Sequence, residues 1–191
     1  DIALHLNLGL VGVEEIGDRL SVLLEDGSKI ETDMVLLALG VMPESGLAKD
    51  AGLALGIRDS IAVDKFMRTT DPFIYAVGDA VQTTHFVSGA PSYIPLAGPA
   101  NKQARVAADN IASQDGKQTA YAGPQGTSVL KLFEMTVATT GLNVEEAAKA
   151  GFEADSVIIR DINHASYYPG ARDITLKVVY EKNTATLLGA Q

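Results

Sequence analysis

Hydrophobic and polar positions in the first forty residues follow a pattern typical of β structure. Short apolar runs at 11–13 and 20–24 are followed by Asp26-Gly27, a pair that favours a tight hairpin turn. Residues 33–40 are apolar on both faces, which predicts a central strand of a sheet covered on both sides. Pro43 ends this run, because proline has no N–H to donate to a sheet ladder.

The next fifty residues alternate short elements with turns. We expect a short helix at 47–51, with Gly52 as its C-cap, and a short strand at 61–64. A second apolar strand ends at Gly78-Asp79, and residues 81–93 have the mixed polar composition of a loop. His85 lies in this loop, where a histidine is more often solvated or structurally hydrogen-bonded than catalytic.

A longer helix is predicted from residue 97 or 99 to residue 112. Pro99 is compatible with its first turn. The free N–H groups of that turn, together with the helix dipole, favour negative charge there. Small and apolar residues at three- and four-residue spacings predict one buried face, made of Ala100, Ala104, Ala107, Ala108 and Ile111.

The pattern changes after residues 114–125, whose composition predicts a linker. We expect one long strand at 127–139, then a helix that begins after Asn143 and ends at Gly151. Further strands are predicted at 156–161 and 173–180, and another begins at residue 187. The predicted fold class is therefore α/β in the first part and a separate α+β domain in the second.

Composition narrows the possible functions. The chain has 191 residues, 47% of them hydrophobic, and a net charge of −9 without clustered Lys or Arg. An acidic surface repels phosphate backbones, so nucleic acid is not an expected partner. The sequence has no cysteine, which excludes a disulfide, a thiolate metal site or a redox-active thiol within these residues. No apolar run approaches the roughly 20 residues that cross a bilayer, so we expect no membrane association and a cytoplasmic location.

Both ends of the sequence indicate part of a longer protein. The chain starts at Asp1 without an initiator methionine, and residues 187–191 have the pattern of the middle of a strand.

Residues 69–80 are the strongest candidate for chemistry. Gly78 permits a ligand to approach the backbone, and Asp79 follows at the carboxyl end of the predicted strand, where open α/β sheets bind ligands. A carboxylate there accepts hydrogen bonds from hydroxyl groups, such as those of a ribose or ribityl chain. Gly-Asp alone favours an ordinary turn, whereas the whole twelve-residue run favours a ligand site.

This run resembles the second flavin-binding motif of the pyridine nucleotide-disulfide oxidoreductases. The resemblance implies that Gly78 and Asp79 lie on the ribityl side of FAD. It also implies that Pro95, Leu96 and Ala97 begin a helix directed at the pyrimidine side of the isoalloxazine, where it stabilises the anion of the reduced flavin. An ordinary packing helix explains the small residues, but not this entrance 16 residues after Asp79.

Residues 38–43 resemble the connecting motif of the same family, which implies that backbone near Gly40 passes close to a nicotinamide cofactor. A plain strand end followed by a turn is the alternative. The resemblance implies three parts: residues 1–60 from an NAD(P)-binding domain, 61–125 from an FAD-binding domain, and 126–191 from a truncated dimerisation domain. The implied cofactors are FAD and NAD(P)H, and the implied assembly is a homodimer.

The resemblance is nearest to the branch of coenzyme A-disulfide reductases, NADH oxidases and NADH peroxidases. It implies that Asn101 and Lys102 face the substrate, although an exposed Asn on a helix needs no function. It also implies that Tyr167 or Tyr168 reaches across the dimer and donates a hydrogen bond or a proton to a leaving thiolate. Packing of a turn is the alternative for both tyrosines.

The expected parent protein passes electrons from NAD(P)H through FAD to a disulfide, such as coenzyme A disulfide, or to a persulfide or polysulfide. The two glycine-rich phosphate-binding fingerprints and the redox cysteine of that branch are missing from these 191 residues. One alternative is an oxidase or peroxidase on the same scaffold. Another, for the isolated chain, is a non-catalytic dimerisation module that binds FAD weakly or not at all.

Overall fold

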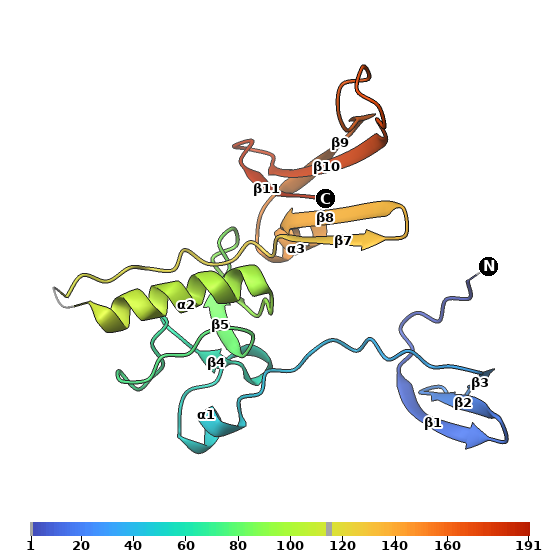
Figure 1. Ribbon diagram of the computed structural model, residues 1–191, viewed down its shortest axis with the longest axis horizontal. Helices are drawn as coiled ribbons and strands as arrows, with labels where there is room; N and C mark the ends of the chain where they lie inside the picture. The colour runs from blue at the N-terminus through green and yellow to red at the C-terminus, as the bar shows by residue number, and fades with distance from the viewer. Residues whose placement is uncertain (1, 114–115) are drawn as a thin grey trace. The chain divides into compact units, whose positions relative to one another are not determined.

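The chain folds into two separate units, Asp1–Val41 and Met42–Gln191, in the computed structural model (Figure 1). The structure describes residues 2–113 and 116–191. Residue 1 and the first two residues of the predicted 114–125 linker lie outside this description.

The first unit is an antiparallel sheet of order β1-β2-β3. Its strands are β1 (Leu10–Ile16), β2 (Arg19–Leu24) and β3 (Lys29–Thr32). The predicted hairpin turn is confirmed: Gly27 has φ +82°, and the Asp26 carboxylate accepts a 2.8 Å hydrogen bond from the Ser28 N–H.

The central strand predicted at 33–40 is wrong. These residues form no strand, and Leu36 is 86% exposed. A strand that is apolar on both faces is stable only between paired neighbours and under covering layers. The described residues of this unit provide neither, because the sheet ends at Thr32.

The second unit begins with small elements around a three-stranded sheet of order β4-β5-β6, in which β4 and β5 are parallel. The elements are α1 (Gly46–Asp50), the 3₁₀ turn η1 (Ile57–Asp59), β4 (Ile61–Ala62), β5 (Val81–Thr84) and β6 (Pro91–Ser92). The predicted helix end is confirmed, since Gly52 has φ +72° and its N–H donates to the Lys49 carbonyl at 3.0 Å.

Two predictions in this part are wrong. Residues 81–93 are not all loop, because pairing with β4 makes a strand of a polar segment that local sequence does not mark as one. The apolar strand predicted before Gly78 is reduced to a single bridge between Arg68 and Tyr75, and Phe73 is 91% exposed. An apolar run becomes a regular strand only when neighbouring strands pair with it.

Helix α2 (Ala97–Ala112) confirms the predicted bounds, but not the predicted face. Its buried residues are Gln103, Ala107 and Asn110. Of the predicted face, Ala104, Ala108 and Ile111 are exposed. The side-chain amides of Gln103 and Asn110 explain why a different face is buried, because each bonds to the backbone of a loop that lies against the helix.

The last part is a five-stranded antiparallel sheet of order β7-β8-β11-β10-β9 with one helix. Its elements are β7 (Ser128–Leu132), β8 (Met135–Gly141), α3 (Val144–Lys149), β9 (Ala154–Ile162), β10 (Asp173–Glu181) and β11 (Leu187–Ala190). The helix and the last three strands confirm the predictions. The single strand predicted at 127–139 is wrong, because a turn with Phe133 at φ +51° folds it into a hairpin.

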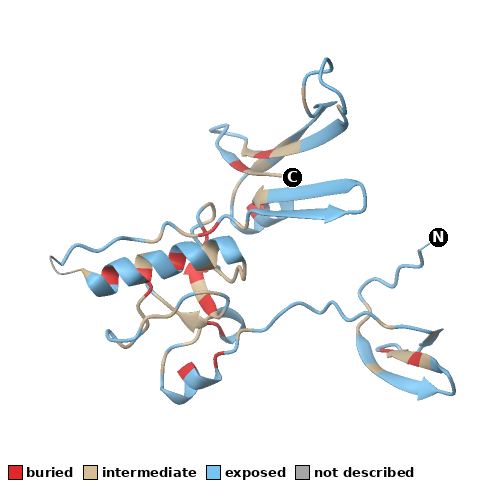
Figure 2. Cartoon of the chain, in the orientation of Figure 1, coloured by how far each residue is buried: buried red, intermediate tan, exposed pale blue. Residues whose placement is uncertain are grey.

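The main hydrophobic cluster lies in this last part, between the sheet and α3. Leu142, Ala147, Val179 and Leu188 form it, and Val87 packs against it from the loop after β5. Figure 2 shows buried positions on β10 and β11, whereas the β7–β8 hairpin is mostly exposed. The mixed α and β architecture agrees with the predicted fold class.

The described residues hold neither a membrane-spanning helix nor a metal-binding cluster. No helix among them has the length and apolar character to cross a membrane. Within residues 2–113 and 116–191, no group of three or more His, Asp or Glu side chains is placed to hold a metal ion.

Candidate functional site

The predicted Gly78-Asp79 motif forms a turn after the Arg68–Tyr75 bridge. Gly78 has φ +89°, which favours glycine, and no atom lies within 4 Å of the place that a Cβ would occupy. The Val81 N–H approaches the Gly78 carbonyl at 3.4 Å, so the turn leads directly into β5. Asp79 is exposed at the tip of this turn. The open space beside Gly78 and the free edge of Asp79 suit a ligand that carries hydroxyl groups.

Gln103 joins this turn to helix α2. The Gly78 N–H donates a 2.8 Å hydrogen bond to Gln103 Oε1, and Gln103 is only 2% exposed. The sequence analysis missed this residue, because a glutamine inside a helix carries no local signal of a contact 25 positions away. The one indication in the sequence was its helical spacing to Ala107 and Asn110, which places the three residues on one face. The alanines of the helix suggested a different buried face.

The start of α2 is the second part of the site. Leu96 is the N-cap in an extended conformation, and no side chain caps this end. Pro95 and Leu96 are half-buried, whereas Ala97 and Gly98 are exposed. Amides of the first turn have no partner within the helix, so those of Ala97 and Gly98 are available to an anion or a polar ring edge.

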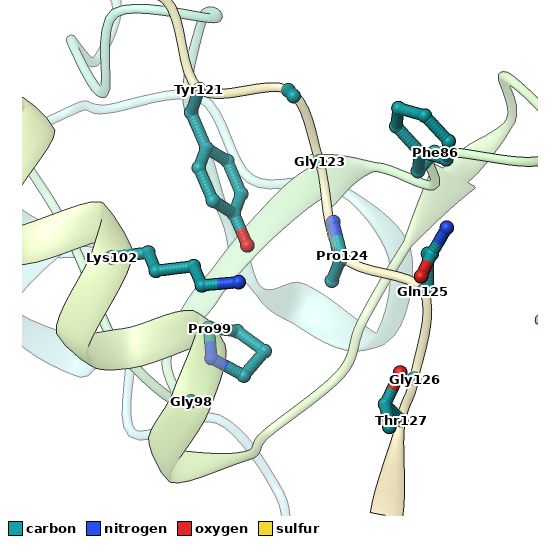
Figure 3. Close-up of a pocket in the computed structure, with 11 residues that line it drawn as sticks. Phe86, Gly98, Pro99, Lys102, Tyr121, Gly123, Pro124, Gln125, Gly126 and Thr127 are labelled. Carbon is teal, nitrogen blue, oxygen red and sulfur yellow. The ribbon is translucent and has the colours of Figure 1, made fainter. Parts of the chain in front are cut away.

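A pocket of about 310 Å³ opens beside this helix start. It is lined by Phe86, Gly98, Pro99, Lys102 and residues 121–127. Figure 3 shows the Lys102 amine and the Tyr121 phenol extending into it from the helix and from the segment that follows. Burial raises the pKa of Tyr121, and a hydrogen bond with the Gln103 side chain opposes that rise. Sequence reasoning missed Tyr121, which lies in the predicted linker.

The other predicted site residues are Asn101, the two tyrosines and Gly40. Asn101 is exposed on α2. Tyr167 and Tyr168 pack on each other with ring centroids 4.8 Å apart, and they are 80% and 59% exposed. Gly40 belongs to the first unit, where it is exposed with φ +78°.

His85 confirms the prediction of a structural hydrogen bond. Its ring is 7% exposed, and Nδ1 accepts hydrogen bonds from the N–H groups of Val87 and Ser88, both at 3.2 Å. Burial lowers the pKa of His85, while Glu146 and a hydrogen bond with the Gln125 backbone oppose this shift. A neutral ring with an unprotonated Nδ1 is therefore what shapes the turn that presents Val87.

Comparison with protein families matches almost the whole chain. Residues 1–116 match the family described as pyridine nucleotide-disulphide oxidoreductase. Residues 127–191 match the dimerisation domain of the same family.

Curated relatives cover the chain over nearly its full length. An NAD(P)H sulfur oxidoreductase (CoA-dependent) of Pyrococcus furiosus is 36% identical over 191 residues, which is 98% of this chain and 42% of the relative. A coenzyme A disulfide reductase of Staphylococcus haemolyticus is 31% identical over 99% of this chain and 41% of the relative. The chain thus spans about two fifths of the length of these relatives.

Solved structures give the same picture. A crystal structure of reduced Bacillus anthracis CoADR-RHD has a TM-score of 0.86 and 44% identity, covering 96% of this chain and 32% of that one. A water-forming NADH oxidase from Lactobacillus brevis, bound to NADH, has a TM-score of 0.85 and 26% identity, covering 96% and 40% of the two chains.

Proposed function

Since this chain belongs to the pyridine nucleotide-disulphide oxidoreductase family, we propose that its parent protein is an FAD-dependent NAD(P)H oxidoreductase. The proposed electron acceptor is the disulfide of a low-molecular-weight thiol such as coenzyme A, or a persulfide or polysulfide. The observation that carries the proposal is the hydrogen bond that joins the Gly78-Asp79 turn to helix α2. The left-handed glycine turn that presents the exposed Asp79 is joined by the Gly78 N–H to Gln103 of the helix whose first-turn amides are uncapped.

The groups present fit part of FAD. Asp79 accepts hydrogen bonds from ribityl hydroxyls, Gly78 leaves room for close approach, and the amides of Ala97 and Gly98 favour negative charge on a ring edge. A glycine-rich pyrophosphate loop is not among these 191 residues, so the fit covers the flavin end of the cofactor. Bound FAD supplies the two-electron chemistry, and this chain supplies orientation and electrostatics.

Three further assignments belong to the same proposal. Residues 1–60 are the end of an NAD(P)-binding domain in which Gly40 lies near the nicotinamide. Residues 61–125 are one wall of the flavin site, and residues 126–191 form part of a homodimer interface. The match of residues 127–191 to a dimerisation domain supports the last assignment.

Substrate recognition is proposed for Asn101 and Lys102 on α2 and for one of the paired tyrosines. Lys102 extends into the pocket beside the helix start, where its charge favours an anionic substrate (Figure 3). Tyr167 and Tyr168 are exposed, so a phenol is available to a partner subunit and can donate a hydrogen bond or a proton to a leaving thiolate.

Steady-state turnover of the full-length flavoprotein tests this proposal. We expect a bound FAD spectrum that NADH or NADPH bleaches without oxygen, and we expect a higher kcat/KM for coenzyme A disulfide or a polysulfide than for oxygen. A full-length protein without bound flavin contradicts the proposal.

An NADH oxidase on the same scaffold is the second candidate function. It is favoured by an NADH oxidase of Enterococcus faecalis that is 30% identical over 100% of this chain and 42% of that relative. The same assay decides between the two, because preferred turnover with oxygen or peroxide supports the oxidase or peroxidase.

For the isolated 191-residue chain, the proposal is a dimerising module without catalysis. Titration with FAD tests it. We expect little or no change in the flavin spectrum, whereas stoichiometric binding would contradict the idea of a non-catalytic module.

A further inference from the structure

We propose that Gln103 is a positioning residue that holds Asp79 at a fixed separation from the start of helix α2. The inference rests on the proposed function, because the two groups matter together only if they contact one flavin. Nothing in the family match or in the names of the relatives assigns a role to this side chain.

A hydrogen bond joins the Gly78-Asp79 turn to helix α2. The Gly78 N–H lies at a left-handed residue, so the regular pairing of a sheet or helix does not satisfy it. Its acceptor is Gln103 Oε1 at 2.8 Å, and the glutamine is almost fully buried. A buried amide that loses its acceptor is costly, and the Gly78 turn is therefore expected to change shape when the glutamine is removed.

Gln103 lies near the start of helix α2. It lies six residues after Ala97, which corresponds to about 9 Å along the axis at 1.5 Å per residue. One rigid helix thus presents uncapped amides at its start and an anchor for the Gly78-Asp79 turn less than two turns later. Because Gln103 also binds Gly78, the helix fixes the distance between Asp79 and the first-turn amides, the two proposed flavin contacts.

Gln103 also interacts with the Tyr121 phenol, whose pKa this hydrogen bond lowers against the effect of burial. Tyr121 is itself held in place, because its backbone N–H donates to the Lys65 carbonyl at 2.7 Å. Gln103 Oε1 accepts from Gly78, so the amide nitrogen is the donor that this side chain can offer to the phenol.

The same helix offers a matched control. Asn110 lies seven residues further along, is also buried, and also bonds to loop backbone, at Phe66 and Thr119. Among the described residues, its side chain hydrogen-bonds Phe66 and Thr119 and not the Gly78-Asp79 turn. Loss of either amide should destabilise the packing of α2, but loss of Gln103 alone should displace Asp79.

The test compares variants of the full-length flavoprotein by FAD affinity, flavin spectrum and urea unfolding. We expect Gln103→Leu to weaken FAD binding by about tenfold, the factor that corresponds to one lost hydrogen bond of about 1.4 kcal/mol. Asn110→Ala should change FAD affinity less than twofold at a comparable loss of stability. Gln103→Glu keeps an acceptor for Gly78 and should restore affinity to within about threefold of wild type.

Each outcome bears on a distinct claim. If Gln103→Leu does not fold, Gln103→Glu and Tyr121→Phe provide the comparison, and Tyr121→Phe should shift the flavin spectrum and weaken binding less than Gln103→Leu would. If Gln103→Leu and Asn110→Ala weaken FAD equally, or if neither does, the positioning role is wrong while the flavoprotein assignment stands. If the wild-type protein binds no FAD, both proposals fail.

Discussion

Residues 42–126, which carry the proposed flavin contacts and are called the flavin-side region here, are stabilised by different interactions from residues 127–191, the dimerisation region matched by the family comparison. The dimerisation region has a five-stranded sheet and a hydrophobic cluster around Leu188 and Val179. The flavin-side region has a sheet of two very short strands and one of four residues. Its loops are tied to α2 by side-chain amides, above all Gln103 and Asn110.

This difference predicts how each region responds to the loss of a side chain. Loss of buried apolar area costs free energy in proportion to that area and to the cavity left behind, whereas a removed buried amide leaves unpaired backbone groups. We therefore expect the dimerisation region to unfold mainly through loss of its core, and the flavin-side region through loss of single hydrogen bonds.

Leu188→Ala gives the largest expected effect. Leu188 is 3% exposed in β11, and its truncation leaves a cavity that lowers the free energy of unfolding by about 3 kcal/mol. The neighbouring Leu187 is 70% exposed, so Leu187→Ala should cost less than about 0.5 kcal/mol. Urea unfolding followed by circular dichroism measures both. Similar losses for the two variants would contradict the assignment of the core.

Asn110→Ala tests the other region, with an expected loss of about 2 kcal/mol. The change removes hydrogen bonds with the Phe66 carbonyl at 3.2 Å, the Thr119 carbonyl at 2.9 Å and the Thr119 N–H at 2.7 Å. Asp109→Ala, at an exposed neighbouring position, is the control. Hydrogen exchange should show loss of protection along α2 with β8–β11 unchanged. Exchange that rises equally in both regions would show that they do not differ in this way.

The same contrast explains how much the sequence predicted. Helix α2, helix α3 and strands β9–β11 agree with prediction, because caps, spacing and alternation act within each element and its partners are nearby. The apolar runs at 33–40 and before Gly78 do not form the predicted strands. Such runs become strands when neighbouring strands pair with them, and the described residues provide no such neighbours.

Apart from Lys102, the residues of the candidate site that were predicted are those that glycine or proline marks. Gly78, Asp79 and the helix start at Ala97 follow from backbone requirements that are visible in the sequence. Gln103 and Tyr121 act through contacts between distant segments, which no local pattern indicates. The buried face of α2 was therefore placed on its alanines rather than on its amides.

Asn143→Ala should have a smaller effect, about 1 kcal/mol. Asn143 caps α3 in a capping box, in which its side chain accepts from the Glu146 N–H at 2.9 Å and Glu146 Oε2 accepts from the Asn143 N–H at 3.0 Å. Asn143→Asp keeps the acceptor and should retain most of the stability. Urea unfolding distinguishes the variants. A loss as large as that of Leu188→Ala would mean that the cap, rather than the core, dominates this region.

The smallest expected effect concerns the loop between β5 and β6, where His85 Nδ1 accepts from the Val87 N–H and Val87 packs against the hydrophobic cluster. Burial lowers the pKa of His85 below its ordinary value of 6.5, and the nearby Glu146 carboxylate and the bond with the Gln125 backbone only partly oppose this. The unfolded chain therefore takes up a proton more readily than the folded chain does. Stability is fully present above pH 6.5 and falls as the pH drops below that value, until the folded state is protonated as well.

His85→Asn isolates this contribution. The Asn oxygen can accept the Val87 and Ser88 N–H groups in place of Nδ1, but it does not titrate. Unfolding free energies between pH 7.5 and about 5.5, set against the ordinary histidine pKa, should fall less for His85→Asn than for wild type. An identical slope for the two proteins would mean that the ring accepts a proton without releasing Val87. The packing of Val87 against the hydrophobic cluster would then not depend on the charge of the His85 ring.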